Sequence, residues 1–237
     1  MSWEDAEAAG LWQGYLWNPS INDPLFRDLR RSFLGASDNW TSLGQRWQQW
    51  ISLLVSLAVD ADGLLTDEDS RRCVRRIPNE GRSRIAWVLA KRLEQAEDRR
   101  ESLFRNRIHP WIAGAWPREN DSRDPRTTDD LIYMASNCGD AFPEAVKLLL
   151  TDNLVGVTNH RGLAIRRIRE LMTGQPENTE PALQLVRAIL PSHDTVVPEP
   201  LRSVAIKVRK LLEKVPATSR SGEAFDSLQS WLDATDA

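Results

Sequence analysis

Apolar residues recur every three or four positions along almost the whole chain, and no stretch of five or more residues alternates polar with apolar side chains. This spacing is typical of α-helices with one buried side, whereas half-buried strands require alternation. The segment 198–215 is the clearest example, with its apolar residues on one side of a helix: Leu201, Val204, Ala205, Val208, Leu211, Leu212 and Val215. We therefore predict an all-α fold without a β-sheet.

Proline, glycine and asparagine divide this pattern into about eleven helices with short connections. Pairs of helices recur with a period of roughly 20 to 40 residues, without a sequence repeat at a fixed offset. We predict an irregular helical stack, a degenerate HEAT-like α-solenoid, with a compact multi-helix bundle as the alternative. The expected helical segments, twelve when the short one at 111–116 is included, span about 3–17, 24–34, 38–58, 67–77, 80–105, 111–116, 128–138, 140–151, 159–173, 178–190, 198–215 and 222–235.

One expected helix and one polar stretch bear on how the chain is organised. The helix at 80–105 is apolar on two sides, which predicts a position between neighbouring helices. The stretch 118–127 has no apolar residue and is expected to be an exposed loop. We therefore predict an N-terminal helical subdomain, 1–117, and a C-terminal helical subdomain, 128–237, joined by the polar loop 118–127.

Two local motifs predict helix ends. Thr66 followed by Asp69 resembles a capping box at the start of the helix at 67–77. In Cys138-Gly139-Asp140, we expect a buried cysteine, a glycine with positive φ that ends one helix, and an aspartate that caps the next.

Tryptophan and arginine are both unusually frequent. The chain has ten tryptophans, and it has 26 arginines against five lysines. We expect most tryptophans to fill the space between helices, because each aromatic side chain buries a large apolar area. Tryptophan and arginine are also the residues that most often anchor protein interfaces.

Charge is distributed in alternating blocks. Residues 1–70 hold four basic and eleven acidic groups (−7), residues 71–107 hold twelve and five (+7), and residues 161–214 hold ten and six (+4). In the densest basic cluster, Asp67 and Glu68 precede Arg71 and Arg72 by four residues, so we expect two local ion pairs. The cations that we expect to bind a partner are Arg75, Arg76, Arg166, Arg169, Lys207, Lys210 and Lys214.

The sequence has no motif for catalysis, a cofactor or a metal. The three histidines are scattered without a second ligand at metal-binding spacing, and there is no Cys-x-x-Cys. The turn Asp60-Ala-Asp62-Gly63 lacks the glycine and glutamate positions of a calcium loop. Neither a glycine-rich phosphate loop nor a nucleophile elbow is present. We expect no cofactor and no enzymatic activity, with a hydrolase that uses His109 as a remote alternative.

The expected cellular compartment follows from the absence of membrane-spanning and secretory patterns in the sequence. It has no run of about 18 apolar residues and no secretory signal at its start. Its two cysteines, Cys73 and Cys138, do not make a disulfide framework. We expect a cytoplasmic protein without membrane contact.

Several landmarks resemble a known family. Trp12-Gln-Gly-Tyr-Leu-Trp17 is similar to the Trp-x-Gly-x-Leu opening of a domain of unknown function, the C-terminal helical part of large bacterial sirtuin-type anti-phage defence proteins. Later similarities lie at Leu25 through Leu34, Asn106 to Pro110, Trp116-Pro117 and Gly139 to Pro143, so the resemblance covers about residues 10–235. In that family a separate N-terminal domain hydrolyses NAD. No segment here resembles it, so the resemblance implies a fragment or a standalone relative without that activity.

These observations lead to one functional expectation and one alternative. We expect a non-catalytic helical scaffold that binds a protein partner, or a larger complex, in an anti-phage defence system. The alternative is a nucleic-acid sensor that uses the arginine-rich faces. The isoelectric point of about 5.7 does not favour that alternative, because nucleic-acid binders are usually basic.

Overall fold

The structure is a computed structural model that describes residues 24–38, 43–44, 46–60, 65–118, 123–158, 160–173, 175–191 and 201–236. Every regular element within these ranges is a helix, and none is a strand. The predicted all-α class is therefore confirmed. The helix expected at about 3–17 and residues 119–122 of the expected loop 118–127 lie outside the described residues. The predicted end of that loop is wrong: a helix begins at Pro125 instead of 128, because Asp124 caps its first turn and proline suits its first position.

The α-helices follow one another with short connections. They are α3 (Pro24–Asp38), α4 (Trp47–Val55), α5 (Asp67–Arg76), α6 (Asn79–Ala96), α7 (Arg100–Leu103), α8 (His109–Ala115), α9 (Pro125–Ser136), α10 (Phe142–Thr151), α11 (Arg161–Met172), α12 (Thr179–Ile189), α13 (Leu201–Leu212) and α14 (Glu223–Asp236). Two π-helical turns, η2 (Ser56–Asp60) and η4 (Phe104–Ile108), and several 3-10 turns connect them.

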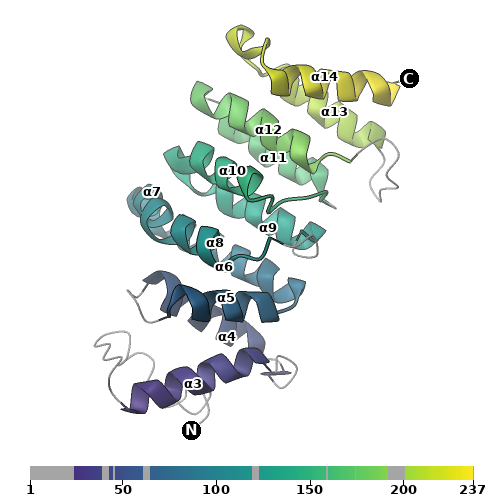
Figure 1. The fold of residues 1–237 in the computed structure, drawn as a ribbon. Coiled ribbons are helices and arrows are strands. Elements are labelled where there is room, and N and C mark those ends of the chain that lie inside the picture. Colours follow the sequence, from purple (N-terminus) through teal and green to yellow (C-terminus); the bar gives the residue numbers. More distant parts are fainter. Residues whose placement is uncertain are drawn as a thin grey trace.

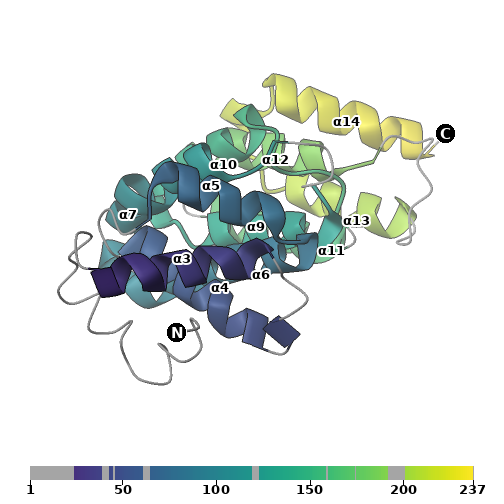
Figure 2. The same ribbon diagram turned by 60° about the horizontal axis from the view of Figure 1, so that its bottom comes forward.

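The helices lie in two rows (Figures 1 and 2). In one row, α4, α6, α9, α11 and α13 contact one another in succession. In the other row, α3, α5, α8, α10, α12 and α14 do the same, so α3 and α14 lie at opposite ends of the stack (Figure 1). The predicted HEAT-like solenoid and the division into two subdomains stay predictions. A single cluster of buried apolar side chains extends from Phe33 in α3 to Leu232 in α14.

Helix α6 is buried on two sides, as its sequence predicts. It packs between α4 and α9, and both of its apolar sides contribute buried residues, among them Ile85, Ala86, Leu89 and Ala90. The helix does not continue to residue 105, because Glu97 adopts a positive φ of 46° and turns the chain. A new helical segment then runs through α7 and η4 directly into α8.

Two helix boundaries near the N-terminal end differ from the prediction. Helix α3 continues through Gly35 to Asp38, since a glycine within a helix costs only about 1 kcal/mol and Phe33 and Ser37 on either side of it are buried. The helix expected from 38 starts only at Trp47, because Gly44 has a positive φ of 52° that no α-helix accommodates.

Most described tryptophans belong to the core. Trp50, Trp111, Trp116 and Trp231 are buried, whereas Trp47 and Trp87 are half-buried. The Trp231 indole N–H donates to the Pro191 carbonyl oxygen (3.0 Å). The expected core role is confirmed for these side chains; Trp3, Trp12, Trp17 and Trp40 lie outside the described residues.

The two predicted helix ends are confirmed in most details. Thr66 and Asp69 form a complete capping box at the start of α5. Gly139 has a φ of 59°, and Cys138 beside it is buried. The expected cap by Asp140 is wrong, because no side chain caps α10. The Asp140 carboxylate instead accepts a hydrogen bond from the side-chain amide of Gln175 (3.1 Å), which precedes the 3-10 turn Pro176–Asn178 packed against α10. None of the described helices is long and apolar enough to cross a membrane.

Candidate functional site

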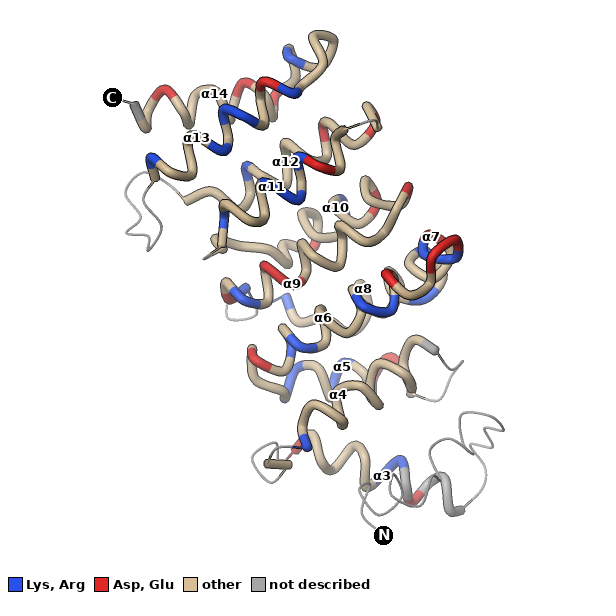
Figure 3. The backbone as a smooth tube through the Cα atoms, turned by 180° about the vertical axis from the view of Figure 1, so that it is seen from behind, with Lys and Arg blue, Asp and Glu red and all other residues tan. Residues whose placement is uncertain are grey.

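A basic groove lies between α11 and α13. It has a volume of about 320 Å³, and four of the seven predicted partner-binding cations line it: Arg166, Arg169, Lys207 and Lys210. Figure 3 shows Lys and Arg positions on these two adjacent helices. The groove therefore joins cations that lie about 40 residues apart in the sequence.

Helical periodicity explains why these side chains face the same way. On α11, Gly162, Arg166 and Arg169 are four and three residues apart, and on α13, Lys207 and Lys210 are three apart, so each set lies on one side of its helix. The opposite sides of both helices carry buried residues such as Ile168 and Val208. Burial of the apolar sides turns the basic sides outward.

Two aliphatic side chains accompany the cations. Leu163 lines the groove and is 42% exposed, and Ile206, immediately before Lys207, is 47% exposed. In the part of the chain that the structure describes, these two are the large hydrophobic side chains that lie exposed at the surface. Exposed aliphatic residues beside a concave surface are typical of a binding site.

The positive charge of the groove is not neutralised by its walls. No carboxylate of the described residues lines it. Arg166 and Lys210 are exposed and Arg169 is half-buried, and none of these three side chains has a polar partner within the described ranges. Lys214 is also exposed, but it lies beyond the end of α13 and does not line the groove.

The other two predicted cations lie elsewhere. Arg75 and Arg76 are on α5, in the opposite row of helices. Arg76 pairs with Asp38 at the end of α3, and Arg75 is exposed without a side-chain partner among the described residues. The structure therefore does not bring Arg75 and Arg76 to the groove.

The two expected local ion pairs in α5 do not form. Arg71 pairs with Glu68 (3.2 Å) and donates to the Gly114 carbonyl oxygen, while Arg72 pairs with Asp38 (2.5 Å). The packing of α3 against α5 brings Asp38 within reach of α5, so a tertiary pair replaces a local one.

An aromatic pocket of about 340 Å³ adjoins the groove, and Leu163 lines both. Trp87 of α6 and Tyr133 of α9 supply its rings. The Arg84 guanidinium lies 3.9 Å from the centre of the Trp87 ring, and the Arg167 guanidinium lies 4.4 Å from that of Tyr133. The first contact lies within α6, and the second links α11 to α9.

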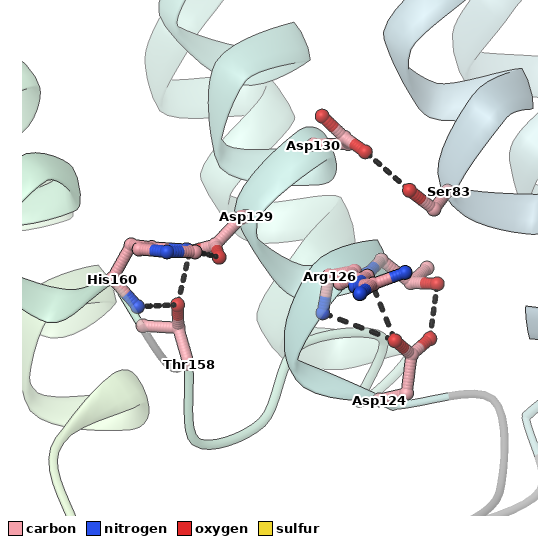
Figure 4. A network of polar contacts seen from close by, with 8 residues as sticks. Ser83, Asp124, Arg126, Asp129, Asp130, Thr158 and His160 are labelled. Atoms are coloured by element: carbon pink, nitrogen blue, oxygen red, sulfur yellow. Dashed lines mark hydrogen bonds and ion pairs between the residues drawn. The ribbon is translucent and has the colours of Figure 1, made fainter. Parts of the chain in front are cut away.

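A polar network fixes the rim of the aromatic pocket (Figure 4). Asp129 accepts a hydrogen bond from the Thr158 hydroxyl and contacts His160 Nδ1 (2.9 Å). The Ser83 hydroxyl donates to Asp130 (2.5 Å), which ties α6 to α9. Burial raises the pKa of Asp130, although the Ser83 hydrogen bond opposes that shift. Sequence reasoning missed this network because its members lie about 30 to 50 residues apart and match no local motif.

Two features of the described residues bear on metal binding and on the hydrolase alternative. No group of three or more His, Cys, Asp and Glu side chains among them could hold a metal ion. His109 lines a separate cavity of about 620 Å³ beside Glu144. Arg105 binds that carboxylate (2.8 Å) and lowers its pKa. The hydrolase alternative stays a prediction.

Comparison with known proteins adds no relative. No protein-family model matches the chain, and no curated protein or solved structure matches it significantly.

Proposed function

We propose that this chain is a non-catalytic helical interaction module whose basic groove binds an acidic segment of a protein partner. The observation that carries the proposal is the combination of Arg166, Arg169 and Lys210, which have no polar partner within the described ranges, with exposed Leu163 and Ile206 on the same two helices. Complementary charge would steer the partner, and the aliphatic side chains would provide apolar contact area.

The aliphatic side chains favour a protein over a nucleic acid. A phosphate backbone needs cations but gains little from exposed leucine and isoleucine. An acidic amphipathic helix satisfies both features, because apolar residues three or four positions apart form a stripe flanked by carboxylates. The nearby Trp87 and Tyr133 provide a pocket for one larger anchoring side chain of the same segment.

The resemblance to the C-terminal helical domains of sirtuin-type defence proteins suggests a biological setting. In this proposal the chain holds a partner within a cytoplasmic anti-phage defence assembly. Its contribution is surface complementarity, and any catalytic step belongs to the partner.

Fluorescence anisotropy with three labelled probes tests the proposal. The probes are a synthetic acidic amphipathic helix with a leucine stripe, the same peptide with lysine in place of each glutamate, and a single-stranded RNA. We expect binding of the acidic peptide alone, weakened about tenfold or more by Arg166→Glu/Lys210→Glu. The matched control is Arg75→Glu/Arg126→Glu, which reverses two exposed cations outside the groove and should leave binding unchanged.

A second pair of substitutions separates the two functional classes. Leu163→Ser/Ile206→Ser keeps every cation, so it should weaken the peptide complex and leave any RNA binding intact. RNA binding that depends on Arg166 and Lys210 but not on Leu163 would instead support the nucleic-acid alternative. Equal affinity for the acidic and basic peptides would contradict the role of charge.

A further inference from the structure

A second concave site lies at the C-terminal end of α6, away from the basic groove. Its volume is about 740 Å³, and three arginines line it: Arg92, Arg99 and Arg107. We call it the arginine site. None of these three arginines is among the cations expected to bind a partner.

An irregular backbone brings these side chains together. Glu97, with a φ of 46°, turns the chain after α6. The following helical segment carries Arg99, Ser102 and Asn106 at intervals of three and four residues, so they share one side of it. The π-helical turn η4 (Phe104–Ile108) then directs Arg107 toward the same site. Such π-helical turns occur frequently at functional sites.

Among the described residues, those that line the site supply hydrogen-bond donors, and none of them is a carboxylate. Arg92 donates to the Ser56 hydroxyl (2.8 Å), which holds its guanidinium in place. Arg99 is exposed and has no side-chain partner among the residues with described positions. The Asn106 amide donates to the Ser102 hydroxyl (3.0 Å), which leaves further donor hydrogens on both side chains.

These donors suit oxyanions with several charges. Guanidinium groups bind phosphate through paired, charge-assisted hydrogen bonds. The same site has an apolar wall formed by Val59, Ala96 and Leu103. Its volume falls in the range of about 300–1,000 Å³ that is usual for small-molecule sites.

We propose that the arginine site binds a nucleoside diphosphate or triphosphate. Arg99, with Arg92 and Arg107, holds the phosphates, and the apolar wall contacts the nucleoside. This site does not share residues with the basic groove, so the proposal stands apart from the proposed function.

Isothermal titration calorimetry tests it with ADP, ATP, AMP and inorganic pyrophosphate at constant ionic strength. We expect ADP and ATP to bind more tightly than either AMP or pyrophosphate. Arg99→Ala should weaken ADP binding by about tenfold, since it removes one charge-assisted contact with phosphate. Arg75→Ala, which removes an exposed arginine on α5, should not change it.

Several outcomes would overturn the proposal. They are no binding of ADP or ATP by the full chain, equal losses in Arg99→Ala and Arg75→Ala, and pyrophosphate binding as tight as ADP binding. A single-stranded RNA that binds at Arg99 when ADP does not would likewise overturn it.

A second variant tests the site independently of Arg99→Ala. Asn106→Asp adds a carboxylate beside Arg99, so it should also weaken ADP binding. Circular dichroism of each variant checks that the fold is retained.

Discussion

Lys207 of α13 lies directly over Gly162 of α11, where a Cβ atom on residue 162 would overlap the lysine ammonium group. The absence of a side chain at Gly162 lets the Lys207 side chain lie across the first turn of α11. This contact places the Lys207 charge between the two helices that form the basic groove.

Gly162→Ala tests this arrangement. The added methyl group should displace the Lys207 ammonium, which is the end of a flexible side chain, and weaken binding of the acidic peptide. The stability should change by no more than about 1 kcal/mol, because alanine favours a helix over glycine and offsets the crowding. Peptide anisotropy and thermal unfolding measure the two effects. A large loss of stability with unchanged binding would contradict this account.

Trp50 is expected to contribute strongly to stability. Its ring stacks on Phe33 with centroids 4.8 Å apart, and its indole N–H donates to the Phe33 carbonyl oxygen (3.3 Å). Trp50→Ala should lower the free energy of unfolding by about 3–5 kcal/mol, as measured in urea. Trp87→Ala is the control. Because Trp87 is only half-buried, this substitution should lower the free energy of unfolding by less.

Alanine substitutions at two glycines should change the stability of the protein in opposite directions. Gly139 has a φ of 59°, and a Cβ there would overlap the Glu101 carboxylate, so Gly139→Ala should destabilise the protein by at least about 1–2 kcal/mol. Gly35 lies within α3 with no atom near its missing Cβ, so Gly35→Ala should stabilise by about 0.5–1 kcal/mol. Chemical denaturation of both variants measures the difference, and the same sign for both would contradict this prediction.

Acidification should weaken the junction between α3 and α5 at Asp69. Burial alone would raise the pKa of Asp69, but hydrogen bonds from Arg30 and Thr66 outweigh it and lower the pKa below its ordinary value of 3.8. The charged carboxylate therefore stabilises the fold above that value, and this contribution is lost as the pH falls through the lowered pKa.

Asp69→Asn tests the pH dependence. The difference in unfolding free energy between the wild type and this variant should be largest near neutral pH and shrink below about pH 4. Denaturant titrations across the acidic range provide the measurement. A difference that grows on acidification would show that the pKa of Asp69 is raised instead.

The two cysteines should be unreactive in the folded protein. Burial raises the pKa of the Cys73 thiol to about 11, and burial also raises that of Cys138. Since the thiolate is the reactive form, a thiol reagent at about pH 8 should modify neither residue until the chain is unfolded. Mass spectrometry with and without denaturant checks this prediction. Rapid labelling of native Cys73 would mean that α5 opens readily.

Local sequence patterns predict the helices well because they depend on residues within one or two turns. The apolar side of α13, the two apolar sides of α6 and the capping box at Thr66 all follow from such spacing. The boundaries near Gly35 and Gly44 could not be predicted, since burial allows one glycine in a helix and a positive φ excludes the other.

By itself, the sequence determined the all-α class and the outward position of Arg166, Arg169, Lys207 and Lys210, because an amphipathic helix must bury its apolar side. Only the tertiary structure decided which charges meet. Packing of α11 against α13 unites four cations in one groove, and packing of α3 against α5 pairs Arg76 with Asp38 instead. The physical reason is that ion pairs and grooves depend on distances between helices, which hydrophobic periodicity along one helix does not specify.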